Sequence, residues 1–133
     1  MSSLIAKVSQ IDNCDNLHIV KFDLKGQTLS MMSLGLSDEI QVGTVVQLLI
    51  KPSHIAIAKN FSGEVSYSNK LDTTIVSIEN GQLLSSVKLS FVDTTLESII
   101  TLNSSLKMDL KVGDKVTALI KASELSIGEI IDD

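Results

Sequence analysis

The feature that most constrains the fold is an internal repeat. The segment "IQVGTVVQLLIKPSHIAIA" at residues 40–58 returns as "LKVGDKVTALIKASELSIG" at residues 110–128, with Val-Gly and Ile-Lys-x-Ser at the same spacing. In the residues before these two segments, the match between the copies is weaker but persists. A segment present twice indicates duplication of one supersecondary unit, because a solenoid needs three or more copies.

Each copy reads as a series of short strands. The first copy contains, in order, the runs "LIAKVSQI", "LHIVKFDL", "QTLSMMS", "TVVQLLI" and "HIAIA". The second contains "TTIVSIE", "LLSSVKLSFV", "LESIITL", "KVTALIK" and "ELSIGEI". Aliphatic and β-branched residues of this kind favour strands. We therefore predict two domains, residues 1–60 and 61–133, joined by the polar segment "KNFSGEVSYSN" at residues 59–69.

The turn signals complete an all-β prediction. Asn80-Gly81 suits a two-residue hairpin with positive φ, and Lys25-Gly26 marks a bend of the same kind. "LGLSDEI" at residues 34–40 and "SSLKMDL" at 104–110 each have room for one helical turn. Five short strands with one helical turn fit a small open barrel of the OB type. A unit of about 65 residues is marginally stable alone, so we expect the two units to pack together and the chain to form a homo-oligomer.

Composition argues against several functions. The net charge is -5, and all eleven basic residues are lysines. Nucleic-acid binding, which needs basic stripes and stacking surfaces, is therefore disfavoured, as is an anionic membrane surface. No apolar run is long enough to span a bilayer, and the N-terminal sequence does not resemble a signal peptide, so we expect a cytoplasmic protein. The single cysteine, Cys14, excludes an intramolecular disulfide.

Catalytic patterns are absent from the sequence. His18 and His54 lie in unrelated contexts, so no metal-ligand spacing is present. Neither a nucleophile elbow nor a glycine-rich phosphate loop is found. We therefore predict that the protein is not an enzyme and holds no metal cation.

The repeated lysines are the first candidates for binding. Lys51 and Lys121 each follow an apolar strand, where a lysine is usually solvated. Their recurrence at one place in both copies makes a binding role more plausible. Thr101 and Ser104 flank the predicted second helical turn, and simple capping is the more common role for such hydroxyls. Ammonium, hydroxyl and backbone N–H groups are all donors, and a site made only of donors suits an oxyanion.

Two segments carry a family resemblance. "LKVGDKVTALIKASELSIG" resembles the C-terminal half of a Mop domain, the molybdate-binding unit also called a TOBE domain. "SYSNKLDTTIVSI" is similar to the opening of that family, Ser-Ala-Arg-Asn-x-Leu-x-Gly-x-Val. As two copies, the resemblance covers nearly the whole chain. It implies a tandem pair of five-stranded OB-like Mop barrels that bind molybdate or tungstate between subunits of a dimer or trimer, as a ligand and not as a redox cofactor.

The resemblance also implies site residues. In the second copy they are Ser66, Ser68 (where Arg is expected), Thr101, Ser104, Lys121 and Ala122, with Ser123 adjacent. In the first copy only Lys51, Pro52 and Ser53 match well, because Met31 and Leu34 stand where Thr and Ser would be, with Ser33 close by. Ser68 cannot replace the bidentate donor fork of an arginine. We therefore expect complete sites on the second copy, with the first copy as packing partner.

Two functions from different classes follow from this resemblance. The leading hypothesis is storage, buffering or homeostasis of molybdate or tungstate by multidentate hydrogen bonding. The alternative is a metalate-sensing module that acts on a molybdate transporter or a transcription partner. A weaker third option is an OB-type nucleic-acid binder, which the acidity of the chain disfavours.

Overall fold

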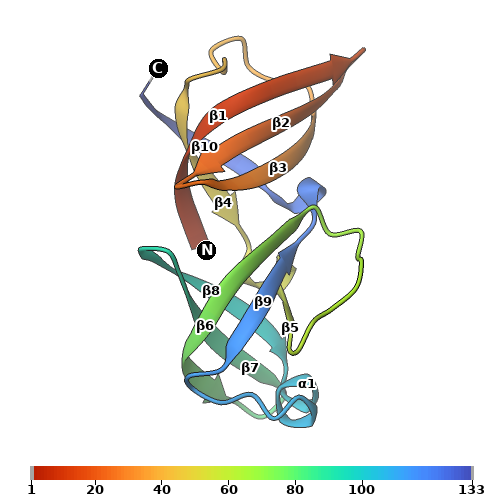
Figure 1. The fold of residues 1–133 in the computed structure, drawn as a ribbon, viewed down its shortest axis with the longest axis vertical. Helices are drawn as coiled ribbons and strands as arrows, with labels where there is room; N and C mark the ends of the chain where they lie inside the picture. The colour runs from red at the N-terminus through yellow and green to blue at the C-terminus, as the bar shows by residue number, and fades with distance from the viewer. Residues whose placement is uncertain (1, 133) are drawn as a thin grey trace.

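The computed structural model describes residues 2–132, which form two antiparallel five-stranded sheets and short helices (Figure 1). The elements are β1 (Ser2–Cys14), β2 (Leu17–Leu24), β3 (Gln27–Leu34), β4 (Val45–Ile50), η1 (Pro52–His54), β5 (Ala56–Ala58), β6 (Asn69–Asn80), β7 (Leu84–Phe91), β8 (Thr94–Thr101), α1 (Leu102–Lys107), β9 (Lys115–Ile120), η2 (Ala122–Glu124) and β10 (Ser126–Asp132). The first sheet has the order β10-β4-β1-β2-β3 and the second the order β5-β9-β6-β7-β8. The predicted all-β fold with two OB-like five-stranded units is confirmed.

Alternating side chains build a core inside each curled sheet. In β1, Leu4, Ala6 and Val8 are buried while the residues between them are exposed. Phe22 on β2 and Leu48 on β4 are fully buried beside them. Strand periodicity of two places one set of side chains inward, and burying a Leu or Phe side chain contributes about 1.5–3 kcal/mol.

The repeated glycine has the same geometry in both copies. Gly43 and Gly113 have φ of +100° and +96°, a region that side chains other than glycine rarely adopt. Their N–H groups donate to the carbonyls of Val8 and Ile75, each over 2.8 Å. Each carbonyl belongs to a long strand that carries a β-bulge at that point. The Val-Gly of the repeat therefore fixes the loop that enters β4 or β9.

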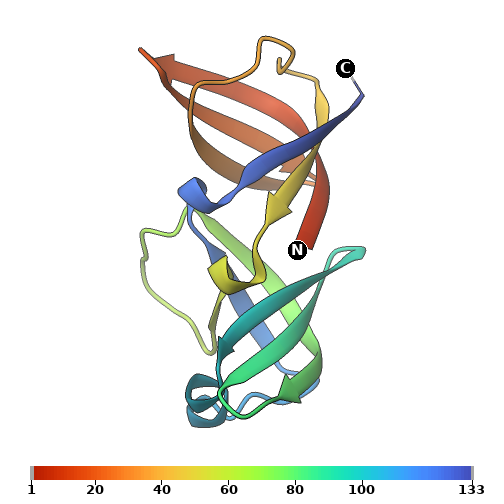
Figure 2. The ribbon, with the colours of Figure 1, turned by 180° about the vertical axis from the view of Figure 1, so that it is seen from behind.

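The last strand of each copy pairs with the sheet of the other copy. β5 lies antiparallel to β9, and β10 lies antiparallel to β4. Figure 2 shows that the chain runs from β4 down into the second sheet and returns from β9 up into the first sheet. The second sheet is thus built from residues 56–120 and the first from residues 2–50 and 126–132. The predicted boundary at residue 60 follows the sequence repeat, whereas the sheets divide the chain elsewhere.

Equivalent contacts join the two sheets. Ser2, the first residue of β1, accepts a hydrogen bond at Oγ from the N–H of Glu97 on β8, over 2.9 Å. Asn69, the first residue of β6, binds the backbone of Ser30 on β3. Each sheet therefore uses the start of its long central strand to hold the third strand of the other.

One of the two predicted hairpins is confirmed and the other is wrong. Lys25-Gly26 forms a two-residue turn with φ of +50° and +88°, and the Lys25 ammonium pairs with Asp93 on the hairpin between β7 and β8. Asn80-Gly81 does not form a two-residue turn. Asn80 pairs with Ser85, the N–H of Gly81 donates to the carbonyl of Leu84 over 2.8 Å, and the Ser85 hydroxyl donates to the Asn80 side chain over 2.7 Å.

Only the second copy has its predicted helical turn. It is α1, whereas residues 34–40 form a bend and a single turn closed by the N–H of Ile40 and the carbonyl of Ser37, over 3.0 Å. Gly35, with φ of +84°, takes the left-handed conformation and prevents a right-handed helix from starting there. Among residues 2–132 every helix is too short or too polar to cross a membrane.

Candidate functional site

The two repeated lysines sit where the chain crosses from one sheet to the other. Lys51 follows β4 and precedes η1, and Lys121 follows β9 and precedes η2. Both have extended backbone, with φ/ψ of -72°/136° and -69°/148°. Their carbonyls accept the N–H groups of His54 and Glu124, each over 2.9 Å. We call the connections at residues 51–55 and 121–125 the two crossings. The Lys-x-Ser segment that the two copies share therefore gives both crossings the same backbone shape.

The two crossings meet at the junction of the sheets. η1 packs against β8, and η2 packs against β3. His54 and Glu124 occupy the same place in the repeat, and Nδ1 of His54 lies 2.7 Å from Oε2 of Glu124. This contact joins the two crossings directly.

Two pockets lie beside the contact between His54 and Glu124. One, of about 330 Å³, is lined by Lys121 together with Ser53 of the first copy and Tyr67 of the linker. The other, of about 240 Å³, is lined by Lys51 together with Ser123 of the second copy. His54 and Glu124 line both pockets. Each predicted lysine thus shares a pocket with the predicted serine of the other copy.

The residues that follow the lysines differ in one respect. Ala122 and Pro52 begin η2 and η1 and offer no polar side chain. A backbone N–H is available at Ala122, but proline has none. The residue after Lys121 therefore has a backbone donor, and the residue after Lys51 has none.

Thr101 and Ser104 lie apart from these pockets. Thr101 caps α1: its Oγ1 accepts the N–H of Ser104 over 3.1 Å and donates to the Ser104 hydroxyl over 2.9 Å. α1 is at the end of the second sheet remote from η2 (Figure 1). Thr101 lines a pocket with Leu84 and Leu106, which are exposed. Within one chain the predicted hydroxyls and Lys121 are not brought together.

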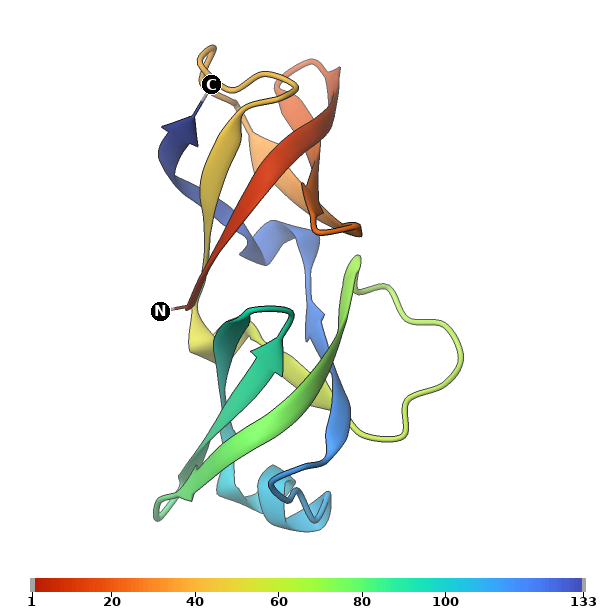
Figure 3. The ribbon, with the colours of Figure 1, turned by 60° about the vertical axis from the view of Figure 1, so that its left-hand side comes forward.

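Ser66 and Ser68 lie in the loop between β5 and β6. Residues 59–68 contain neither strand nor helix and run outside the second sheet (Figure 3). Both serines are exposed, while Tyr67 between them is half-buried and reaches the pocket of Lys121. Asn69, which follows, is fully buried and holds the two sheets together.

Strand pairing corrects the residues assigned to the first copy. Leu17 pairs with Leu34 at the end of the β2–β3 hairpin, just as Leu84 pairs with Thr101 at the end of β7–β8. Leu34, and not Met31, is therefore equivalent to Thr101. Continuing along the chain, Ser37 takes the place of Ser104, and its Oγ accepts the N–H of Glu39 over 3.2 Å. Met31 is buried, and Ser33 donates to the carbonyl of Gly35.

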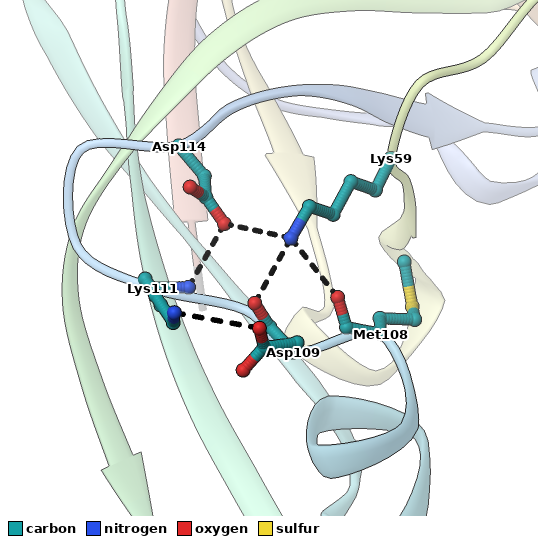
Figure 4. A network of polar contacts seen from close by, with 5 residues as sticks. All are labelled: Lys59, Met108, Asp109, Lys111 and Asp114. Carbon is teal, nitrogen blue, oxygen red and sulfur yellow. Dashed lines mark hydrogen bonds and ion pairs between the residues drawn. The ribbon is translucent and has the colours of Figure 1, made fainter.

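A lysine from the end of β5 fixes the carboxyl end of α1. Nζ of Lys59 donates to the carbonyls of Met108 and Asp109, over 3.0 and 2.9 Å, and lies 3.2 Å from Oδ2 of Asp114 (Figure 4). The N–H of Lys111 donates to the same carboxylate over 2.9 Å. That hydrogen bond, helped by the Lys59 ammonium, lowers the pKa of Asp114 below its ordinary value of 3.8. A cation near the last carbonyls of a helix also favours the helix.

Sequence reasoning missed His54, Glu124 and Tyr67 as pocket residues. His54 and Glu124 fall on one repeat position, so the alignment of the copies contained a signal for them. Tyr67 is the only tyrosine of the chain but carried no repeat signal. Within residues 2–132 no three His, Cys, Asp or Glu side chains gather as a metal site.

Comparison with known proteins gives consistent matches. The TOBE domain profile matches residues 66–127. A crystal structure of the cytoplasmic molybdate-binding protein ModG with molybdate bound has a TM-score of 0.90 and 25% identity, covering 96% of this chain and 94% of that chain. A molybdate-binding protein from Sporomusa ovata is 36% identical and covers 50% of this chain and 100% of that chain, with a TM-score of 0.49.

A transporter component is also similar. The molybdenum import ATP-binding protein ModC of Brucella abortus (strain 2308) is 30% identical over 105 residues, which are 78% of this chain and 28% of ModC. The ModC of Brucella suis biovar 1 (strain 1330) matches equally. The chain therefore corresponds to 28% of the length of these curated relatives.

Proposed function

We propose that the chain belongs to the TOBE-domain family, whose profile matches residues 66–127, and that it binds molybdate or tungstate in the cytoplasm for storage, buffering or homeostasis. The observation that carries the proposal is the likeness to ModG, which extends over 96% of this chain and includes both repeat units. A pocket that brings Lys121 together with Ser53 supports it, because ammonium and hydroxyl groups donate to an oxyanion. Binding of this kind needs only hydrogen bonds, so the proposed role is not catalytic.

We further propose that complete sites form between copies of the chain. Thr101 and Ser104 offer donors at the α1 end, and three leucines beside them are exposed: Leu83 by 81%, Leu84 by 56% and Leu106 by 62%. An exposed apolar patch next to polar groups is typical of a subunit interface. A second copy that covers the leucines and adds its own Lys121 would enclose the anion, in a dimer or a trimer.

Native mass spectrometry of the full chain tests both proposals. With molybdate or tungstate added, we expect a dimer or trimer that carries a fixed number of anions, and no uptake of the smaller sulfate. Lys121→Ala should lower the anion count. Lys88→Ala is the matched control, because Lys88 is an exposed lysine on β7 that lines neither crossing pocket. A folded protein that takes up neither metalate would contradict the binding proposal, and a monomer with bound anion would contradict the interface proposal.

A second candidate function is metalate sensing on a molybdate transporter. The observation that favours it is the similarity to ModC, of which this chain matches a part. A sensor must bind its partner differently when the anion is present. Pull-down of a molybdate-transport ATPase with and without molybdate distinguishes the two functions, since a storage protein would retain no ATPase in either condition.

A further inference from the structure

We propose that His54 is an additional oxyanion-binding residue and that its protonation accompanies anion uptake. The inference rests on the proposed function, since it concerns the same pockets. His54 lines both the pocket of Lys121 and the pocket of Lys51. Its side chain is 37% exposed, so it is accessible to solvent and to a ligand.

The contact with Glu124 fixes which ring nitrogen is left for the anion. Nδ1 of His54 lies 2.7 Å from Oε2 of Glu124, and a carboxylate can only accept, so Nδ1 carries a hydrogen. Nε2 is the remaining ring nitrogen. In the neutral ring Nε2 presents a lone pair, which repels an oxyanion, whereas in the charged ring it is an N–H donor. An anion that contacts Nε2 therefore selects the protonated form of His54.

The charge balance leads to the same conclusion. The charged groups that line the two pockets with His54 are Lys51, Lys121 and Glu124. Each pocket holds one of the two ammonium groups together with the Glu124 carboxylate, so its net charge is zero while His54 is neutral. Protonated His54 raises the net charge of the pocket to +1, which favours a metalate dianion. Burying a dianion without matched donors and charge is unfavourable.

Calorimetry of molybdate binding to the full chain tests the proposal. Titrations at about pH 7 in two buffers of different ionisation enthalpy measure the protons taken up per anion. We expect proton uptake with each anion bound and an affinity that falls as pH rises, because neutral His54 has no N–H donor at Nε2. His18→Gln is the matched control, because His18 is the only other histidine and lines neither pocket.

Two substitutions at position 54 separate binding from a structural role. His54→Gln should bind more weakly below pH 7, with an affinity independent of pH and without proton uptake. His54→Lys carries a charge from about pH 6 to about pH 8 and should keep at about pH 8 the affinity that the native protein has at about pH 6. Proton uptake that persists in His54→Gln, or native binding without proton uptake, would overturn the proposal. If the folded native protein binds no molybdate, the proposed function itself fails.

Discussion

Asn69 and Ser30 lie on different sheets and are joined by two hydrogen bonds. The Asn69 side chain accepts the N–H of Ser30 at Oδ1 over 2.7 Å and donates from Nδ2 to the Ser30 carbonyl over 3.0 Å. Asn69 is fully buried. Its amide therefore pairs with β3 as a backbone residue of a neighbouring strand would, and it fixes the position of one sheet against the other.

Asn69→Ala should destabilise the protein by about 2–3 kcal/mol, because it removes two buried hydrogen bonds and leaves backbone groups of Ser30 without partners. Urea unfolding followed by far-UV circular dichroism measures the loss. Asn13→Ala is the control, since Asn13 is exposed near the β1–β2 turn and should change stability by less than about 0.5 kcal/mol. Equal effects of the two substitutions would show that the Asn69–Ser30 pair contributes little.

Lys121→Ala should weaken molybdate binding more than Lys51→Ala. Both lysines line pockets, but Lys121 is followed by Ala122, which has a backbone N–H, and Lys51 is followed by Pro52, which has none. Loss of a charged donor costs about 1.5–3 kcal/mol, which is roughly a tenfold to hundredfold change in affinity. Calorimetric titration of both variants gives the ranking, and a larger effect at Lys51 would place the main site on the first copy.

Asp114→Asn should destabilise the protein at neutral pH and much less in acid. The folded protein holds the pKa of Asp114 below 3.8, so the carboxylate contributes stability above that value. The contribution is lost as pH falls through the folded pKa, when the native carboxylate also becomes protonated. Urea midpoints at about pH 7 and about pH 3 measure the change.

Asp109→Asn removes the same charge and serves as the control for Asp114. Among residues 2–132, the exposed Asp109 carboxylate pairs only with the Lys111 ammonium, at 3.4 Å, so its loss should matter little at either pH. An Asp114→Asn defect that stayed constant across the pH range would point to altered packing instead of charge.

A fragment of residues 61–133 should fold only by dimerising. It lacks β5, so the edge of β9 is open, and it carries β10 without β4. Because β5 and β10 occupy the same place in the repeat, two fragments can each add β10 beside the partner's β9. Light scattering with circular dichroism should report a folded dimer. A fragment of residues 51–121 has all five strands of the second sheet and should fold without this exchange. A folded monomer of residues 61–133 would contradict the predicted pairing of β10 with the partner's β9.

The strands were predictable because their chemistry is local. Alternation in β1 and the runs around β4 and β9 identify strands without knowledge of their neighbours, and Val-Gly in both copies marks a positive φ at Gly43 and Gly113. Loop length at Asn80-Gly81 was not predictable in this way, because the Ser85 hydroxyl satisfies Asn80 and moves the turn along the chain.

The sequence does not specify that β5 and β10 each pair with the sheet of the other copy. It also does not specify which residues meet in the pockets. The runs that became β5 and β10 suit either sheet equally, since both occupy the same repeat position. The pairing of Lys121 with Ser53 follows from that exchange, as does the meeting of His54 and Glu124. Asn69 was assigned to a polar loop because the residues next to it in the sequence do not indicate that it binds Ser30 of the other sheet.

The route of the chain also sets the order in which its parts can be finished during synthesis. A ribosome releases residues 56–120 before residues 126–132, so the second sheet has all its strands while the edge of β4 still waits for β10. An open strand edge invites pairing with other nascent polypeptides. The half encoded first is therefore the half completed last.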